Sequence, residues 1–134
     1  MKETTRAKAQ LPCSEIGETT ARYLLALLDL DRDDRRTTQA ALARAVGVSA
    51  PTTLEMVRRL RARGLVEDAE LSLTPRGTST ALVLASRRDA ARRWTHEVLG
   101  LEESAAKVEA EHLALNGSPT LGRKLTAWRR SATG

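Results

Sequence analysis

Hydroxyl-bearing and arginine side chains lie at opposite ends of one helical segment, and their chemistry suits contact with nucleic acid. Ser49, Thr52 and Thr53 stand at its start. Hydroxyl groups can bond to base edges or phosphate oxygens, and guanidinium groups bind phosphates. The pattern predicts a helix that reads duplex DNA with its first turns and holds the phosphate backbone with its last. The arginines at its far end are Arg58, Arg59, Arg61 and Arg63.

Two short helices joined by a tight turn must hold these groups. Apolar spacing predicts a first helix over residues 38–46, which Gly47 ends because glycine tolerates the left-handed conformation. Ser49 is expected to cap the second helix, and Pro51 falls in its first turn, where a missing amide donor costs little. An ordinary helical hairpin with a solvated basic end is the alternative. The side chains expected to face the core are Ala40, Leu42, Ala43, Val46, Val48, Met56, Val57 and Leu60.

A helix is expected before this pair and a short β-hairpin after it. Residues 12–30 carry a broad apolar face, and Ser14 or Thr19 could cap that helix. The charged run 29–36 reads as a linker into the two-helix segment. Two apolar pairs then flank a polar tip, which predicts a two-stranded wing over residues 65–73.

The second half of the chain is expected to form three helices. Thr74 and Pro75 signal the start of a helix that runs to about Leu99, with Gly77 a weakness in its first turn. Gly100 breaks that helix, and two more are expected over residues 102–115 and from residue 119 onward. Roughly one side of the helix that ends near Leu99 is expected to carry Ala81, Leu82, Ala85, Trp94, Val98 and Leu99.

Composition favours a small α-helical protein with a polyanionic partner. The chain has 134 residues, 41% hydrophobic content, no Phe and a net charge of +5, and 18 of its 22 basic residues are Arg. Cys13 is the only cysteine, so no internal disulfide can form. The first ten residues are polar and basic, unlike a secretory signal, and no apolar run is long enough for a bilayer, so we expect a cytoplasmic protein. No nucleophile set, phosphate-binding glycine loop or paired carboxylates point to an enzyme.

Several segments together resemble the diphtheria-toxin-repressor family, the iron- and manganese-dependent repressors. They are TTARYLLALLDL, LARAVGVSAPTTLEMVRRLRARGLV, LSLTPRG, WTHEVLGL, EAEH and SPTLGRKL, and they span residues 19–125. The resemblance implies a homodimer that binds a palindromic operator, with a divalent metal as corepressor. It also implies a mostly α fold with a flexible basic N-terminus over 1–13, a winged helix-turn-helix with a short β-hairpin wing over 14–76, and a helical dimerisation domain over 77–134. The chain looks like the shorter, manganese-type architecture of that family.

The resemblance also assigns the expected DNA contacts. Ser49, Pro51 and Thr52 begin the recognition helix, and Pro51 could touch a thymine methyl group. Thr53 stands where the family usually has an apolar residue, and Leu54 where it usually has a small polar one. Leu54 therefore either turns inward or reads thymine methyl groups. Glu55 either accepts a bond from a cytosine amino group or only spaces the helix, and the phosphate candidates are Arg58, Arg59 and Arg63.

The family's metal ligands fall mostly on residues that cannot bind a cation. Arginine carries a permanent positive charge and donates only protons, so it repels a metal ion. We therefore expect the usual site to be lost, because two remaining ligands cannot hold a divalent ion tightly. The positions that depart from the family pattern are Arg22, Arg88, Arg92 and Val108, and those that match it are Glu111 and His112.

Three hypotheses follow for this region, beside the plain interpretation that Glu111 and His112 are a helix surface that pairs with arginine. In the first, arginines replace the metal as a latch, with Arg88 or Arg92 donating to Glu111. In the second, Arg22, Arg88 and Arg92 form a pocket for a small anionic effector. In the third, a remnant or relocated site binds manganese, iron or zinc. Its candidate ligands are Cys13, His96, Glu111 and His112.

The sequence thus predicts a DNA-binding transcriptional regulator that resembles metal-dependent repressors and has a degenerate or altered metal site. A metal-responsive repressor with a relocated site is the first alternative. An effector-free winged-helix module that binds another protein is the second.

Overall fold

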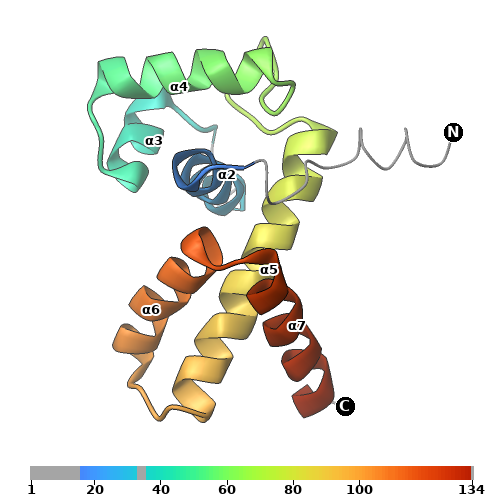
Figure 1. Ribbon diagram of the computed structural model, residues 1–134. Helices are drawn as coiled ribbons and strands as arrows, with labels where there is room; N and C mark the ends of the chain where they lie inside the picture. Colours follow the sequence, from blue (N-terminus) through green and yellow to red (C-terminus); the bar gives the residue numbers. More distant parts are fainter. Residues whose placement is uncertain (1–15, 33–35, 134) are drawn as a thin grey trace, which may run out of the picture. The chain divides into compact units, whose positions relative to one another are not determined.

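Six α-helices follow one another in the part of the chain that the computed structural model describes, residues 16–32 and 36–133 (Figure 1). The chain divides into two compact units, Met1–Leu82 and Val83–Gly134. The division falls inside helix α5, Pro75–Glu97, whereas we predicted a domain boundary after residue 76. The predicted basic N-terminus over residues 1–13 lies outside the described residues, as does Ser14. No described helix has both the length and the apolar character that crossing a bilayer requires.

Helix α2, Glu18–Asp31, supplies most of the apolar core of the first unit. Gly17 occupies its N-cap position in extended conformation, without a side-chain cap bond. Thr19 therefore does not cap this helix, since it lies inside the first turn. The apolar face is buried as predicted, because leucines recur at helical spacing and α2 packs on α3. Its buried members are Ala21, Tyr23, Leu24, Leu25, Leu27 and Leu28.

Helices α3, Gln39–Val46, and α4, Ala50–Ala62, form the predicted pair, and local side chains fix both starts. Thr38 Oγ1 accepts a bond from Ala41 N at 3.1 Å, and Ser49 Oγ accepts one from Thr52 N at 3.3 Å. Gly47, with φ +81°, ends α3 in the left-handed conformation, so the predicted Ser49 cap and turn are confirmed. Thr38, expected as the first residue of the first helix, is its N-cap instead. Ala40 is exposed rather than inward-facing. Among the residues predicted to face the core, Leu42, Val57 and Leu60 are fully buried, whereas Val46, Val48 and Met56 are half-buried.

The Ser49 cap gives a stability prediction. Ser49→Ala removes the acceptor for an orphan amide of α4, and should lower the free energy of unfolding by about 1 kcal/mol. Ser49→Asn keeps an acceptor at the same position, so it should stay within a few tenths of a kcal/mol of the parent. Urea unfolding followed by circular dichroism measures both. Equal losses in the two variants would show that the cap bond contributes nothing.

The segment after α4 contains no regular strand among the described residues, so the predicted β-hairpin is not confirmed. A single antiparallel bridge joins Val66 to Leu73, next to a bond from Glu67 N to Ser72 O of 2.9 Å. Arg61 holds the tip instead: its Nε donates to Glu67 O at 2.7 Å, and its Nη2 lies 3.4 Å from Glu70 O. The two apolar pairs are too short to form a β-ladder. Arg61 of α4 instead holds the turn between them through its bonds to backbone carbonyl groups.

The start of α5 corrects the prediction about Gly77. Thr74 Oγ1 accepts a bond from Gly77 N at 3.0 Å and so caps the helix. Gly77 is buried, and a Cβ at this position would lie 2.1 Å from Leu65 O. The glycine is therefore not a weakness of the helix. It lets the first turn of α5 approach the backbone that leaves α4.

The second unit is built from the rest of α5 with α6, Glu103–Asn116, and α7, Pro119–Thr133 (Figure 1). Gly100, with φ +73°, separates α5 from α6 as predicted. Small side chains make much of the core: Ala90, Ala91 and Ala110 are fully buried together with Leu125. Of the residues expected along one side of α5, Ala81 and Ala85 are buried, whereas Leu82, Val98 and Leu99 are 48%, 54% and 55% exposed. A helix whose apolar residues are spread round its circumference gives little information about which side is inward.

Candidate nucleic-acid interface

The first turn of α4 presents the predicted polar side chains to solvent, with one exception. Ser49, Pro51 and Thr52 are exposed, and Ser49 Oγ lies 2.9 Å from Thr52 Oγ1. Thr53 is fully buried, and its hydroxyl donates to Ser49 O at 3.0 Å. A side chain without exposed surface cannot touch DNA, so Thr53 leaves the set of candidate contacts. It acts as a core residue, which agrees with the apolar residue that the family usually has there.

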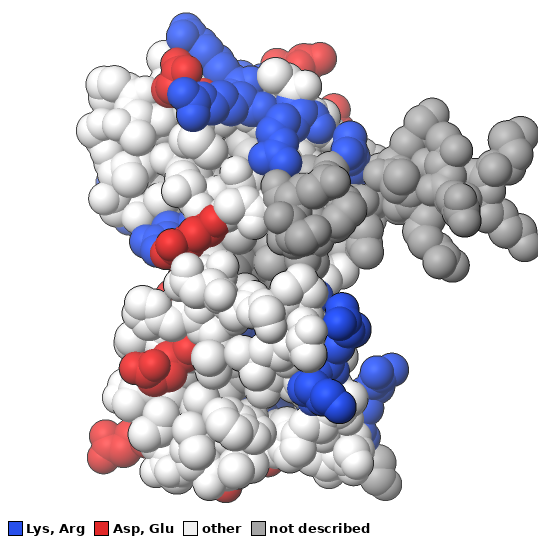
Figure 2. All heavy atoms as spheres, in the orientation of Figure 1, with Lys and Arg blue, Asp and Glu red and all other residues white. Residues whose placement is uncertain are grey.

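The middle and end of α4 carry an exposed basic strip. Arg58 and Arg59 are exposed, and Arg59 Nε lies 3.5 Å from Glu55 Oε1. Both partners of this pair are more than half exposed, so the pair holds Arg59 only loosely. Lys and Arg side chains gather over α4 at the top of Figure 2. Leu54 is half-buried, which favours the inward orientation over the reading of thymine methyl groups.

The two arginines nearer the end of α4 have other interactions. Arg61 donates to the carbonyl groups of Glu67 and Glu70 in the segment that follows α4. Arg63 is half-buried and also has an interaction partner within the protein. Sequence reasoning grouped all four arginines together, because nothing local distinguishes them. The structure leaves Arg58 and Arg59 as the arginines of α4 with exposed side chains.

Arg22 stands at the first position where the resemblance implies a metal ligand. It lies beside the turn of the helix-turn-helix. Its Nη2 donates to Glu18 Oε1 at 3.0 Å, one turn earlier on the exposed side of α2. It lines a hollow of about 350 Å³ with Tyr23, Val48 and Thr52, among others. The Tyr23 hydroxyl is buried there without a hydrogen-bond partner among the described residues. Arginine thus pairs with a carboxylate on its own helix, so it is not poised to receive a cation.

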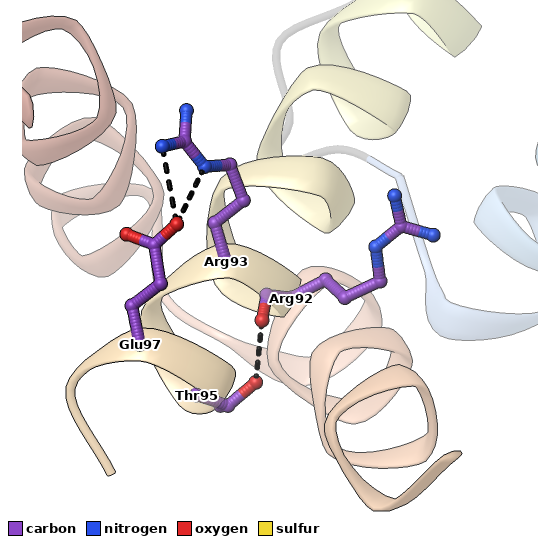
Figure 3. A network of polar contacts seen from close by, with 4 residues as sticks. All are labelled: Arg92, Arg93, Thr95 and Glu97. Atoms are coloured by element: carbon purple, nitrogen blue, oxygen red, sulfur yellow. Dashed lines mark hydrogen bonds and ion pairs between the residues drawn. The ribbon is translucent and has the colours of Figure 1, made fainter. Parts of the chain in front are cut away.

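Arg88 and Arg92, which also replace ligands that the resemblance implies, lie on α5 one turn apart. Arg88 is half-buried and has an interaction partner of its own. Figure 3 shows Arg92 and Arg93 leaving α5 in different directions, with Arg93 Nε and Nη2 each 3.2 Å from Glu97 Oε1. The Arg92 carbonyl accepts a bond from Thr95 Oγ1 at 3.0 Å, while its guanidinium extends from the exposed side of the helix.

The two matching positions, Glu111 and His112, are exposed on α6. Within the described ranges, no ion pair joins Glu111 to Arg92, so the bond expected for the latch between these two residues is not made. No three metal-ligating side chains come together in the same part of the chain. His96 Nδ1 lies 2.7 Å from Leu101 O, and Cys13 falls outside the described residues. The donor chemistry therefore does not fit the site that the resemblance implies.

Comparisons with known proteins agree with the geometry of the first unit. Residues 22–67 match a family model described as winged helix-turn-helix DNA-binding. The iron-dependent repressor IdeR of Mycobacterium tuberculosis is 29% identical over 100 residues, which are 72% of this chain and 44% of that protein. The diphtheria toxin repressor of Corynebacterium diphtheriae is 27% identical over 99 residues, with the same shares covered. The chain thus spans less than half the length of these curated relatives.

A solved structure extends the likeness of fold into the second unit. A structure of the manganese regulator SloR shares 24% sequence identity with this chain and superposes with a TM-score of 0.70. The match covers 86% of this chain and 54% of the other. Since the matched part exceeds residues 22–67, the similarity of fold extends beyond the winged helix-turn-helix.

Proposed function

We propose, from the premise that this chain is a homologue of the diphtheria-toxin-repressor family of metal-dependent repressors, that it is a DNA-binding transcriptional regulator of the repressor type. The observation that carries the proposal is the exposed surface of α4, with Ser49 and Thr52 at its start and Arg58 and Arg59 farther along. No enzymatic activity is assigned, and the relatives reported above are repressors. We place the protein in the cytoplasm, where such a regulator meets DNA.

In this proposal the first turn of α4 enters the major groove. The exposed hydroxyl groups of Ser49 and Thr52 can bond to base edges or phosphates, and Pro51 can contact a thymine methyl group. The positive end of the α4 helix dipole lies at the same turn and favours a phosphate. Arg58 and Arg59 bind the phosphates that flank the groove. Glu55, already beside Arg59, orients that arginine rather than reading a base.

We further propose that the protein binds a palindromic operator as a homodimer formed by its C-terminal part. Support comes from large apolar side chains that lie in solvent on the second unit, since such groups often mark a protein–protein contact. Val98, Leu99 and Val108 are 54%, 55% and 57% exposed. Val108 stands where the family has a metal ligand, so its side chain adds apolar surface rather than a donor.

DNA binding is proposed to need no metal corepressor. Arg88 and Arg92 put permanent charge one helical turn apart at positions where the resemblance implies ligands, and both repel a cation. Operator affinity should therefore be the same, within about twofold, in EDTA and in manganese. The measurement is selection of bound sequences from random duplexes in chelator and then in manganese, followed by titration of the recovered sequence. A large loss of affinity in chelator would contradict metal independence, and recovery of no sequence at all would contradict the regulator.

A relocated metal site remains the second candidate, and one observation favours it. The contact from His96 Nδ1 to Leu101 O leaves Nε2 able to bind a metal. Glu111 and His112 are the other ligands proposed for it. Calorimetric titration of manganese, iron(II) and zinc into the parent and a His112→Ala variant distinguishes a relocated metal site from a protein that binds no metal at these residues. A stoichiometric signal lost in that variant would establish the relocated site.

A protein-binding module without an effector is the third candidate, and it uses the same exposed surfaces for a different partner. A mobility-shift titration with genomic fragments at physiological salt distinguishes it from the regulator. The regulator should shift a subset of fragments at nanomolar concentration, in the range of about 10⁻⁸–10⁻¹¹ M typical of specific complexes.

A further inference from the structure

A basic pocket opens between α5 and α7 within the second unit, away from every position considered so far. It has a volume of about 510 Å³, inside the range of small-molecule sites. Val83 and Ala127 give it an apolar part, and Ser86 and Thr126 supply hydroxyl groups. Its four cationic side chains are Arg87, Arg123, Lys124 and Arg130.

Gly122 lets one of these cations lie directly against α7. A Cβ at position 122 would stand 2.5 Å from Arg87 Nε and 2.8 Å from Arg87 Cζ. Any larger residue would displace this guanidinium, so the glycine makes room for it at the wall of the pocket. Arg123 is oriented by its own helix, since its Nη2 donates to Thr120 Oγ1 at 3.3 Å.

The charged residues that line this pocket are all basic. No carboxylate is among the residues that line it, and Thr126 already donates its proton to Gly122 O at 2.9 Å. Arg87, Arg123 and Lys124 place like charges on two helices, and a multivalent anion would relieve their mutual repulsion. Figure 2 shows Lys and Arg along the α7 side of this unit and Asp and Glu along its α6 side.

The lining also limits the kind of anion. Guanidinium and ammonium groups bind phosphate oxygens, and several of them in one cavity suit a ligand with more than one phosphate. No aromatic side chain lines the pocket, so it lacks the platform on which a nucleobase would stack. We propose that this pocket is an effector site for a small organic molecule that carries two or more phosphate groups.

Tripolyphosphate is the probe for this site, titrated by calorimetry into the full chain at fixed ionic strength. Saturable binding with one site per chain is expected. The double variant Arg123→Gln/Lys124→Gln should bind at least about tenfold more weakly, because each lost charge-assisted bond is worth roughly that factor or more. Lys107→Gln is the matched control: it removes a positive charge from exposed α6 without touching the pocket, and should change affinity less than about twofold.

Three outcomes would overturn the proposal. The first is no saturable binding by the parent. The second is equal weakening by Lys107→Gln, which would mean general charge attraction. The third is a duplex DNA that competes with tripolyphosphate while the double variant loses DNA affinity by the same factor, which would make the pocket a backbone contact. Retention of DNA affinity by the double variant supports an effector site. Since the calorimetry contains no DNA, its result is independent of the proposed regulatory function.

Discussion

Replacing Arg58 and Arg59 together by alanine is expected to weaken binding to every duplex sequence by about a hundredfold at moderate salt. Each guanidinium is proposed to make a charge-assisted bond to a phosphate, and two such bonds account for this factor. Both side chains are exposed, and the pair between Arg59 and Glu55 is a surface pair worth little to folding. The fold should therefore survive the substitution unchanged.

Salt dependence gives this prediction its sharper test. Each phosphate contact contributes about 0.9 to the slope of log affinity against log salt, so the double variant should lose about 1.8 from that slope. The matched control removes two exposed charges from elsewhere, with Arg32→Ala and Lys107→Ala combined. Fluorescence anisotropy with a labelled duplex at four salt concentrations measures both slopes. A parent-like slope in the double variant would remove Arg58 and Arg59 from the interface.

Gly77→Ala is expected to cost about 3 kcal/mol of unfolding free energy, at the high end of what overpacking usually costs. The added methyl group would lie 2.1 Å from the Leu65 carbonyl oxygen, and that oxygen belongs to backbone, which cannot swing away. The start of α5 must then move from the segment that leaves α4. Urea unfolding of parent and variant gives the difference in free energy.

Gly17→Ala is the control for Gly77→Ala. Nothing lies within 4 Å of a Cβ at position 17, and its φ of −70° suits any residue. Its effect should be about 1 kcal/mol or less, because alanine is a poorer N-cap residue than glycine but meets no clash here. If both variants lost stability equally, the cost would come from backbone entropy and not from the contact with Leu65.

The helix-turn-helix was predictable because its determinants are local. Thr38 and Ser49 each cap the helix that follows within three residues, and Gly47 ends α3 by its own conformational freedom. The roles of Arg61 and Gly77 were not predictable, since each depends on which backbone another segment brings to it. Thr53 is polar in type but buried, and Arg61 is basic in type but structural.

The candidate site was predictable only as a list of positions. Resemblance located Arg88, Arg92 and Glu111, but which way a guanidinium extends depends on packing that no spacing encodes. The side of α5 that packs inward could not be predicted for the same reason, because its apolar residues do not follow one clear helical stripe. The α5–α7 pocket had no signal in the sequence at all, since Arg87 and Gly122 stand far apart along the chain.

The methyl-lined centre of the second unit determines how mutation can damage it. Ala90, Ala91 and Ala110 have almost no side-chain atoms to lose, so truncation cannot open large cavities at these positions. Added bulk, by contrast, has nowhere to go, because it must wedge apart helices that already touch. Harmful substitutions here should therefore be almost all enlargements, and a survey of tolerated variants should show residue volume capped at that of alanine or serine.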